Sequence, residues 1–194
     1  MYNSHLLLEG EINIQASGFY VSGVHAFLDA QIDFKSGSVV NINASQPPGL
    51  SSNSGGYGIY TWSNATTNIE EGAVVNIKTL NRGGVGNLDR STFNLYGQLN
   101  IDVSNTGSGT TLDYYAIANW STIYGGNQFT AYSGAELNIK STQRQIFLNG
   151  AKDLLEANRF TWEAGSKLSV STPQGAQAFP VSYTHLTLPT KLEV

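Results

Sequence analysis

Carboxylates are the residues in this chain that could supply calcium ligands or a general acid and base, and they are sparse. Asp29 and Asp33 are spaced so that both can face the same way on a strand, but one lies near a predicted turn and no third acid follows at a matching spacing. Glu70 and Glu71 precede Gly72 in a second predicted turn. We therefore expect structural or solvent-exposed roles for these acids and assign no catalytic residue.

The segment GGVGNLDR, residues 83–90, partly resembles the calcium-binding glycine-rich repeat of β-roll proteins. Its aspartate, Asp89, stands one position late, and the motif occurs once. Beside Arg90 it is typical of a solvated pair in a flexible glycine-rich loop. His5 and His25 lack a second metal ligand or a nucleophile in the sequence pattern. We expect no metal and no cofactor.

Aromatic residues give the strongest indication of a binding site. The segments YGIYTWS and YYAIANWS align as I-x-x-W, which matches Ile59 with Ile117 and Trp62 with Trp120. Side chains alternate between the two faces of a strand, so a tryptophan three positions after an inward isoleucine points outward. The pattern predicts that both tryptophans lie on the surface.

Tyr60 and Tyr115 are the predicted neighbours of Trp62 and Trp120. Flat aromatic faces next to hydroxyl and amide groups suit stacking against sugar rings or burial in a protein partner. We therefore take Tyr60, Trp62, Tyr115 and Trp120 as the candidate ligand-binding residues. The alternative is that a turn follows each isoleucine, so that the indole folds back over the core or under a loop.

A glycine-led phrase occurs six times, at intervals of 25 to 37 residues. Apolar and polar residues alternate after each glycine, which is typical of a strand with one buried face. A shorter apolar strand precedes most of these glycines, so the glycine marks a turn where a positive φ or a close backbone approach is required. The phrases are GEINIQAS (from Gly10), GSVVNINAS (Gly37), GAVVNIKT (Gly72), GQLNIDVS (Gly97), GAELNIKS (Gly134) and GSKLSVST (Gly165).

A third strand-like segment separates the phrases, so each repeat has about three strands. Stacking equivalent strands of successive repeats gives an all-β, right-handed parallel β-helix of about six coils. An antiparallel sandwich also has alternating strands, but it does not require one repeated phrase. AKDLLEANR, from Ala151, is the one helical candidate and fits a single turn within a loop. We expect hydrogen-bonding roles on the outer face for the recurring asparagines, Asn13, Asn41, Asn76, Asn100 and Asn138.

The composition excludes several classes of function. Charged residues make up 12% of the chain, about half the roughly 25% of typical soluble domains, and the net charge is −4. The ten Lys and Arg residues form no basic cluster, so no nucleic-acid partner is expected. No apolar run reaches the ~20 residues of a membrane span. Because cysteine is absent, there is no disulfide framework and no thiolate metal site.

The G-x-h-N-I phrase with its preceding F-x-x-x-x-G strand resembles the pectate-lyase-like adhesive domains of Gram-positive bacterial surface proteins, over roughly residues 6–172. The resemblance implies a non-catalytic, extracellular adhesion module that is attached to the cell wall through other segments and binds a glycan or a host surface protein. The resemblance implies no catalytic residues in this chain. The competing hypothesis is a fragment of a pectate-lyase-like polysaccharide lyase or glycoside hydrolase.

The two ends of the chain differ from its repeats. Residues 181–194, beginning VSYTHLTLPT, resemble translated sequencing-adapter DNA, so we expect a β-helix fragment over 1–180 and a non-native tail over 181–194. Residues 1–10 lack the basic start and long apolar stretch of a secretion signal. No polar cap is visible at either end of the repeats, which favours truncation at both ends.

Overall fold

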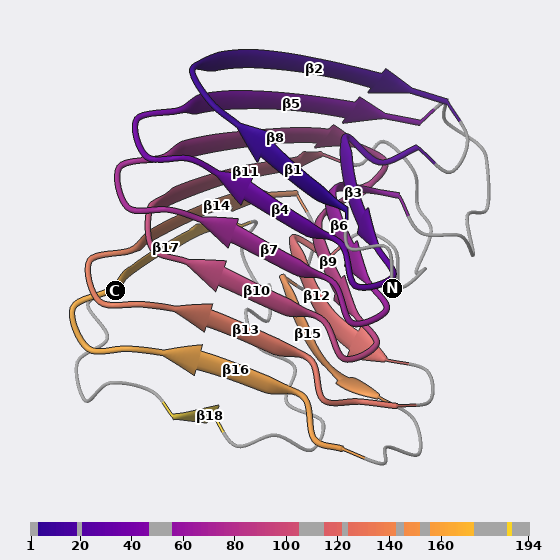
Figure 1. Cartoon of the computed structure of the whole chain (residues 1–194), viewed down its shortest axis with the longest axis vertical. Helices are drawn as coiled ribbons and strands as arrows, with labels where there is room; N and C mark the ends of the chain where they lie inside the picture. The colour runs from indigo at the N-terminus through magenta and orange to yellow at the C-terminus, as the bar shows by residue number, and fades with distance from the viewer. Residues whose placement is uncertain are drawn as a thin grey trace.

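All regular structure in the described part of the chain is β-strand. No helix occurs among the residues that the structure, a computed structural model, describes. These residues are 4–18, 21–46, 56–104, 115–121, 124–142, 146–151, 156–172 and 186–187. Their strands form three parallel sheets that wrap around one core (Figure 1).

We call the three sheets A, B and C. Sheet A contains β1 (His5–Leu8), β4 (Gln31–Phe34), β7 (Thr66–Ile69), β10 (Thr92–Leu95), β13 (Gln128–Ala131), β16 (Arg159–Trp162) and β18 (Leu186–Thr187). Sheet B contains β2 (Glu11–Ser17), β5 (Val39–Ser45), β8 (Val74–Leu80), β11 (Gln98–Ser104), β14 (Glu136–Ser141) and β17 (Lys167–Ser171). Sheet C contains β3 (Val24–Phe27), β6 (Tyr57–Trp62), β9 (Gly83–Leu88), β12 (Ile117–Ser121) and β15 (Phe147–Ala151).

The chain passes from sheet A to sheet B to sheet C and back, and each strand pairs in parallel with the equivalent strand of the next coil. The six glycine-led phrases form the six strands of sheet B, in register. Their central apolar residues make one column facing the core: Ile14, Ile42, Ile77, Ile101, Ile139 and Val170. The predicted right-handed parallel β-helix of about six coils is confirmed.

Aromatic rings form a second column inside the helix. Phe93, Phe129 and Phe160 of sheet A are buried and stack with centroid separations of 4.9 and 4.5 Å. Each buried aromatic or aliphatic side chain contributes roughly 1.5–3 kcal/mol, so such columns account for the repeated apolar positions. The repetition is explained by packing alone.

The glycines at the sheet A to sheet B turns act in the two ways that the sequence indicates. Gly10, Gly37, Gly72, Gly134 and Gly165 have positive φ angles between 77° and 91°. Gly97 is not among them, and it is required for a different reason. A Cβ there would lie 2.3 Å from the carbonyl oxygen of Glu70 and 2.5 Å from that of Ala73.

Gly97→Ala is therefore expected to lower the free energy of unfolding by about 3 kcal/mol, the upper end of the range for overpacking. Gly134→Asn is the matched control. Gly134 has a φ of +86°, a Cβ there would meet nothing within 4 Å, and asparagine tolerates the left-handed region. We expect it to cost less than about 1 kcal/mol in denaturant titrations. Equal costs for the two variants would contradict the close approach at Gly97.

The prediction of a flexible loop at residues 83–90 is wrong, because residues 83–88 form β9, in the middle of sheet C. Side chains from neighbouring strands occupy the space beside the glycines of β9. A Cβ at Gly83 or Gly86 would lie 2.4 or 2.6 Å from ring atoms of Tyr57, whose ring covers the outer face of the strand. A Cβ at Gly84 would lie 2.5 Å from Ile101. The glycines thus serve close packing in a strand.

Two predicted features fall mainly outside the described residues. Residues 152–155 of the helical candidate are outside them, whereas Ala151 ends β15 and Glu156 bridges to Gly125. Of the segment expected to be non-native, Leu186–Thr187 is described and forms β18, which pairs with β16.

The recurring asparagines form a hydrogen-bonded ladder on the outer face of sheet B. Each Nδ2 donates to the Oδ1 of the preceding coil over 2.8–3.0 Å. The ladder runs from Asn138 through Asn100, Asn76 and Asn41 to Asn13. The hydrogen-bonding role expected for these asparagines is confirmed.

On sheet A a similar ladder ends on a carboxylate. Asn94 donates to Asn68, which donates over 2.7 Å to the buried carboxylate of Asp33. Gln31 donates to Asp33 as well, and the His5 ring nitrogen lies 2.7 Å away. Burial raises the pKa of Asp33, but the hydrogen bonds from Asn68, Gln31 and His5 outweigh it and hold that pKa below its ordinary value.

Because the pKa of Asp33 is lower in the folded than in the unfolded chain, its ionised form favours folding. This contribution is complete above the ordinary aspartate pKa of about 3.9 and is lost as the pH falls through the lower folded value. We expect Asp33→Asn to cost about 1–3 kcal/mol at pH 6, because its amide replaces one of the two acceptor oxygens that bind Asn68, Gln31 and His5 and removes the charge. The difference from the unmodified protein should shrink as the pH falls toward 2. A difference independent of pH in urea titrations would refute this role.

Candidate functional site

The candidate site lies on the outer face of sheet C. There the side chain three positions after each inward apolar residue points outward, and parallel pairing aligns these side chains in one column: Phe27, Trp62, Leu88 and Trp120. A second outward column contains His25, Tyr60, Gly86 and Ala118. Trp62 and Trp120 are two coils apart, as the alignment of their segments predicts.

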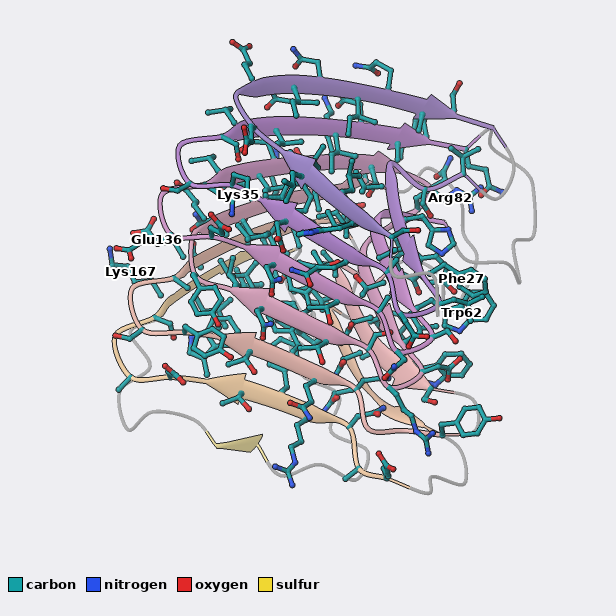
Figure 2. The ribbon with its side chains drawn as sticks, in the orientation of Figure 1. Phe27, Lys35, Trp62, Arg82, Glu136 and Lys167 are labelled. Carbon is teal, nitrogen blue, oxygen red and sulfur yellow. The ribbon has the colours of Figure 1, made fainter. Side chains whose placement is uncertain are left out.

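Four rings at one end of these columns touch one another, and we call them the aromatic strip: His25, Phe27, Tyr60 and Trp62. The centroid of Phe27 lies 4.9 Å from that of Trp62, and that of His25 lies 4.8 Å from that of Tyr60. Tyr60 and Trp62 are 6.0 Å apart. Figure 2 shows Phe27 and Trp62 together at the edge of the molecule, pointing away from the core.

The strip is accessible to a ligand. Phe27 is 42% exposed, and Leu28, which follows it, is 55% exposed. His25 is exposed, whereas Tyr60 and Trp62 are half-buried. Partial burial against neighbouring side chains lowers the pKa of the His25 ring. A continuous, partly exposed apolar surface is therefore present over β3 and β6.

Trp62 is held in place by the next coil. Its indole Nε1 donates a 2.6 Å hydrogen bond to Oδ2 of Asp89, and the Ser121 hydroxyl lies 2.5 Å from the other carboxylate oxygen. β6 continues to Trp62 and then bends at Ser63, where φ is 60°. The outward direction of Trp62 is thus confirmed, and the early turn of the alternative hypothesis does not occur here.

Tyr115 is less accessible than the other predicted residues. Tyr115 is only 7% exposed and packs in a cluster with Tyr57, Leu88 and Ala118, so the expectation that it lies beside an exposed tryptophan is not met. Burial also raises the pKa of its phenol. Trp120 points outward and is half-buried, as Tyr60 and Trp62 are, and all three pack against this cluster. Of the four predicted residues, Tyr115 is thus the buried one, whereas Tyr60, Trp62 and Trp120 are partly exposed.

Sequence reasoning missed Phe27 and His25. The signal was present, because Val24 pairs with Ile59 and begins the same pattern, V-x-x-F in place of I-x-x-W. Extending the alignment by one coil places Phe27 beside Trp62.

The acidic residues considered as catalytic or metal-binding candidates do not lie together in the structure. Asp29 lies at a left-handed bend and accepts a hydrogen bond from Asn64 of the next coil. Asp33 belongs to the ladder on sheet A, and Glu70 pairs with Lys35 at a turn. Among the described residues, no group of three or more His, Asp and Glu side chains is placed to hold a metal ion.

Asp89 and Arg90 do not form the solvated pair that their adjacency indicates. Asp89 binds the side chains of Trp62 and Ser121. Arg90 lies 3.4 Å from Glu156 and packs over the ring of Tyr124 at 4.9 Å. Both residues thus take part in structural contacts between coils.

Sheet B carries a different surface. A shallow hollow of about 640 Å³ lies over its asparagine ladder, with Lys78, Asp102 and Lys140 along one side. Lys140 and Asp102 are 3.7 Å apart. The outward side chains that line this hollow are polar or charged, so it offers hydrogen bonds and no aromatic surface.

Comparisons with known protein families, with curated proteins and with solved structures give no match for this chain. Within the described residues, no helix has the length and apolar character needed to cross a membrane.

Proposed function

We propose that this protein is a non-catalytic adhesion module that binds glycans through the aromatic strip on sheet C. The observation that supports it most strongly is the contact of Phe27, Tyr60 and Trp62 in one partly exposed surface, built from two neighbouring coils. Exposed aromatic residues in such a group indicate an interaction surface.

The chemistry of the strip suits a sugar ring. One face of a pyranose carries mainly C–H groups, which pack against an aromatic ring, and its hydroxyls need hydrogen-bond partners at the edge. Asp29 and Asn64 follow β3 and β6, the strands that carry the strip, and Asp89 follows β9, the next strand of sheet C. Their remaining lone pairs and N–H groups suit hydroxyl recognition.

Rigidity of the strip favours binding. The hydrogen bond to Asp89 fixes the indole of Trp62, and ring contacts on both sides fix Tyr60. A ligand that stacks on these rings therefore has little side-chain entropy to remove.

The resemblance of the repeated phrase to Gram-positive adhesive domains supports the setting that we propose, namely the outside of a bacterial cell, with cell-wall attachment through other segments. In that setting the β-helix acts as a rigid support that presents sheet C to glycans of a host or of the environment.

The test is a glycan array and pull-down on immobilised polysaccharides with the unmodified protein and Trp120→Ala. We expect at least one glycan to bind. Trp120→Ala should weaken it by less than about fivefold, because Trp120 lies two coils from Trp62 and is separated from the strip by Leu88. Absence of any glycan ligand, or a greater loss from Trp120→Ala than from changes in the strip, would argue against the proposed face.

A further inference from the structure

The turns between sheets A and B differ in length. Four of them contain four residues: 35–38, 70–73, 132–135 and 163–166. The connection from β10 to β11 contains only Tyr96 and Gly97, and that from β1 to β2 only Glu9 and Gly10. The turns form a column along one corner of the molecule, opposite the strands of sheet C (Figure 1).

Where one long turn follows another, the two are joined by a pair of hydrogen bonds. The Ser36 N–H donates over 3.0 Å to Oε2 of Glu70, and the Gly37 N–H donates over 3.2 Å to the carbonyl oxygen of Gly72. The two adjacent amides of the upper turn thus bind one carboxylate and one carbonyl from the next coil.

The same pair of bonds recurs lower in the helix. The Ser133 N–H donates over 3.2 Å to Oε2 of Glu163, and the Gly134 N–H donates over 3.3 Å to the carbonyl oxygen of Gly165. In two independent turns, therefore, the first amide of the pair binds a carboxylate oxygen and the second binds a carbonyl oxygen.

In turn 70–73 the equivalent two amides are those of Glu71 and Gly72, and the next coil places the short connection of Tyr96 and Gly97 beside them. Tyr96 occupies the position of the glutamate there, and the Tyr96 and Gly97 N–H groups both donate back to Ile69. Among the described residues, neither the Glu71 nor the Gly72 N–H has an acceptor. Both residues are exposed, so a ligand can reach these donors.

Tyr96 adds an aromatic surface and a hydroxyl to these donors. It is 38% exposed and stacks on Tyr132 with centroids 4.1 Å apart. Burial of the phenol, together with its hydrogen bond to Tyr132, raises the pKa of Tyr96 to about 12, so the hydroxyl stays protonated. The nearby carboxylates of Glu70 and Glu163 already have partners in Lys35 and the Ser133 amide.

We infer that the backbone amides of Glu71 and Gly72, with Tyr96 beside them, form a binding subsite for a carboxylate group of a ligand. Two neighbouring amides that point the same way are a general anion-binding arrangement. Here the chain's own Glu70 and Glu163 show that the amide equivalent to that of Glu71 donates to a carboxylate, while the amide equivalent to that of Gly72 donates to a second oxygen beside it. The carboxylate can come from a sugar acid or from a peptide. This subsite does not rest on the proposed function of sheet C.

The test is a titration of the ¹⁵N-labelled protein followed by amide NMR, with acetate, glucuronate and an N-acetylated dipeptide as separate probes. We expect saturable shifts of the Glu71 and Gly72 amides at millimolar acetate. The amides of Ser36 and Ser133 should stay unchanged, because they are already bonded. Tighter binding of glucuronate than of the dipeptide assigns the source to sugar acids, and the reverse assigns it to peptides. Absence of saturation, or equal shifts in all turns, would overturn the inference.

A pair of variants tests the role of position 96. Tyr96→Glu supplies a carboxylate from the chain and should weaken acetate binding at Glu71 and Gly72 by about tenfold or more. Tyr96→Gln has the same length without the charge and should bind acetate within about threefold of the unmodified protein. If the two variants bind acetate equally well, the amides do not form the subsite.

Discussion

Phe129→Ala is expected to lower the free energy of unfolding by about 3–5 kcal/mol. Phe129 is completely buried and lies between Phe93 and Phe160, with ring centroids at 4.9 and 4.5 Å. Removing its ring leaves a cavity in the centre of a column that the parallel strands hold at fixed spacing. Urea titration monitored by circular dichroism measures the change.

Thr130→Ala, one position along the same strand, is the control. Its side chain points to the other face of β13 and is half-buried, so we expect a change within about 0.5 kcal/mol. Similar losses from the two variants would mean that the alternation between core and surface is wrong for this strand.

Trp62→Ala is expected to weaken glycan binding by about 30-fold or more, which corresponds to the roughly 2 kcal/mol that defines a hot-spot residue. The substitution removes the ring that contacts Phe27 and Tyr60 and leaves the Asp89 carboxylate without its indole donor. Isothermal titration with a glycan identified on the array gives the affinity.

Tyr96→Ala is the matched control for binding, because Tyr96 is an exposed aromatic residue on a different corner of the molecule. We expect a neutral glycan to bind this variant and the unmodified protein with affinities within about twofold. A comparable loss in both variants would show that binding does not depend on the strip.

The β-helix itself could be predicted because its signal is repeated. Glycine-led strands with Ile42, Ile77 and Ile101 at equivalent positions indicate stacking even when loop lengths vary. β9 could not be recognised in this way. Its glycines have no side chains to show alternation, and its partner is the ring of Tyr57, which lies in the preceding coil.

The candidate site was predicted in part. The outward direction of Trp62 follows from strict alternation after Ile59, which continues to the end of β6. Tyr115 does not follow from this pattern. Alternation from Ile117 would turn it toward the core. Ala116 and Ile117 are both buried, so the alternation breaks there, and Tyr115 packs instead with Tyr57, Leu88 and Ala118. A column of small residues at the position of Ala116 packs near the isoleucines of sheet B: Gly23, Gly58 and Gly84. The direction in which Tyr115 points is therefore set by packing between sheets. The alternation pattern of a single strand does not reveal that packing.

The central claim, that a glycan stacks on the outer face of sheet C, is tested most directly by the indole N–H signals of the three tryptophans during a glycan titration by NMR. Trp162 is an internal reference, since it belongs to the core cluster on sheet A. We predict a large saturable shift for Trp62, a smaller one for Trp120 and none for Trp162. Saturable binding that leaves the Trp62 signal unchanged would contradict it.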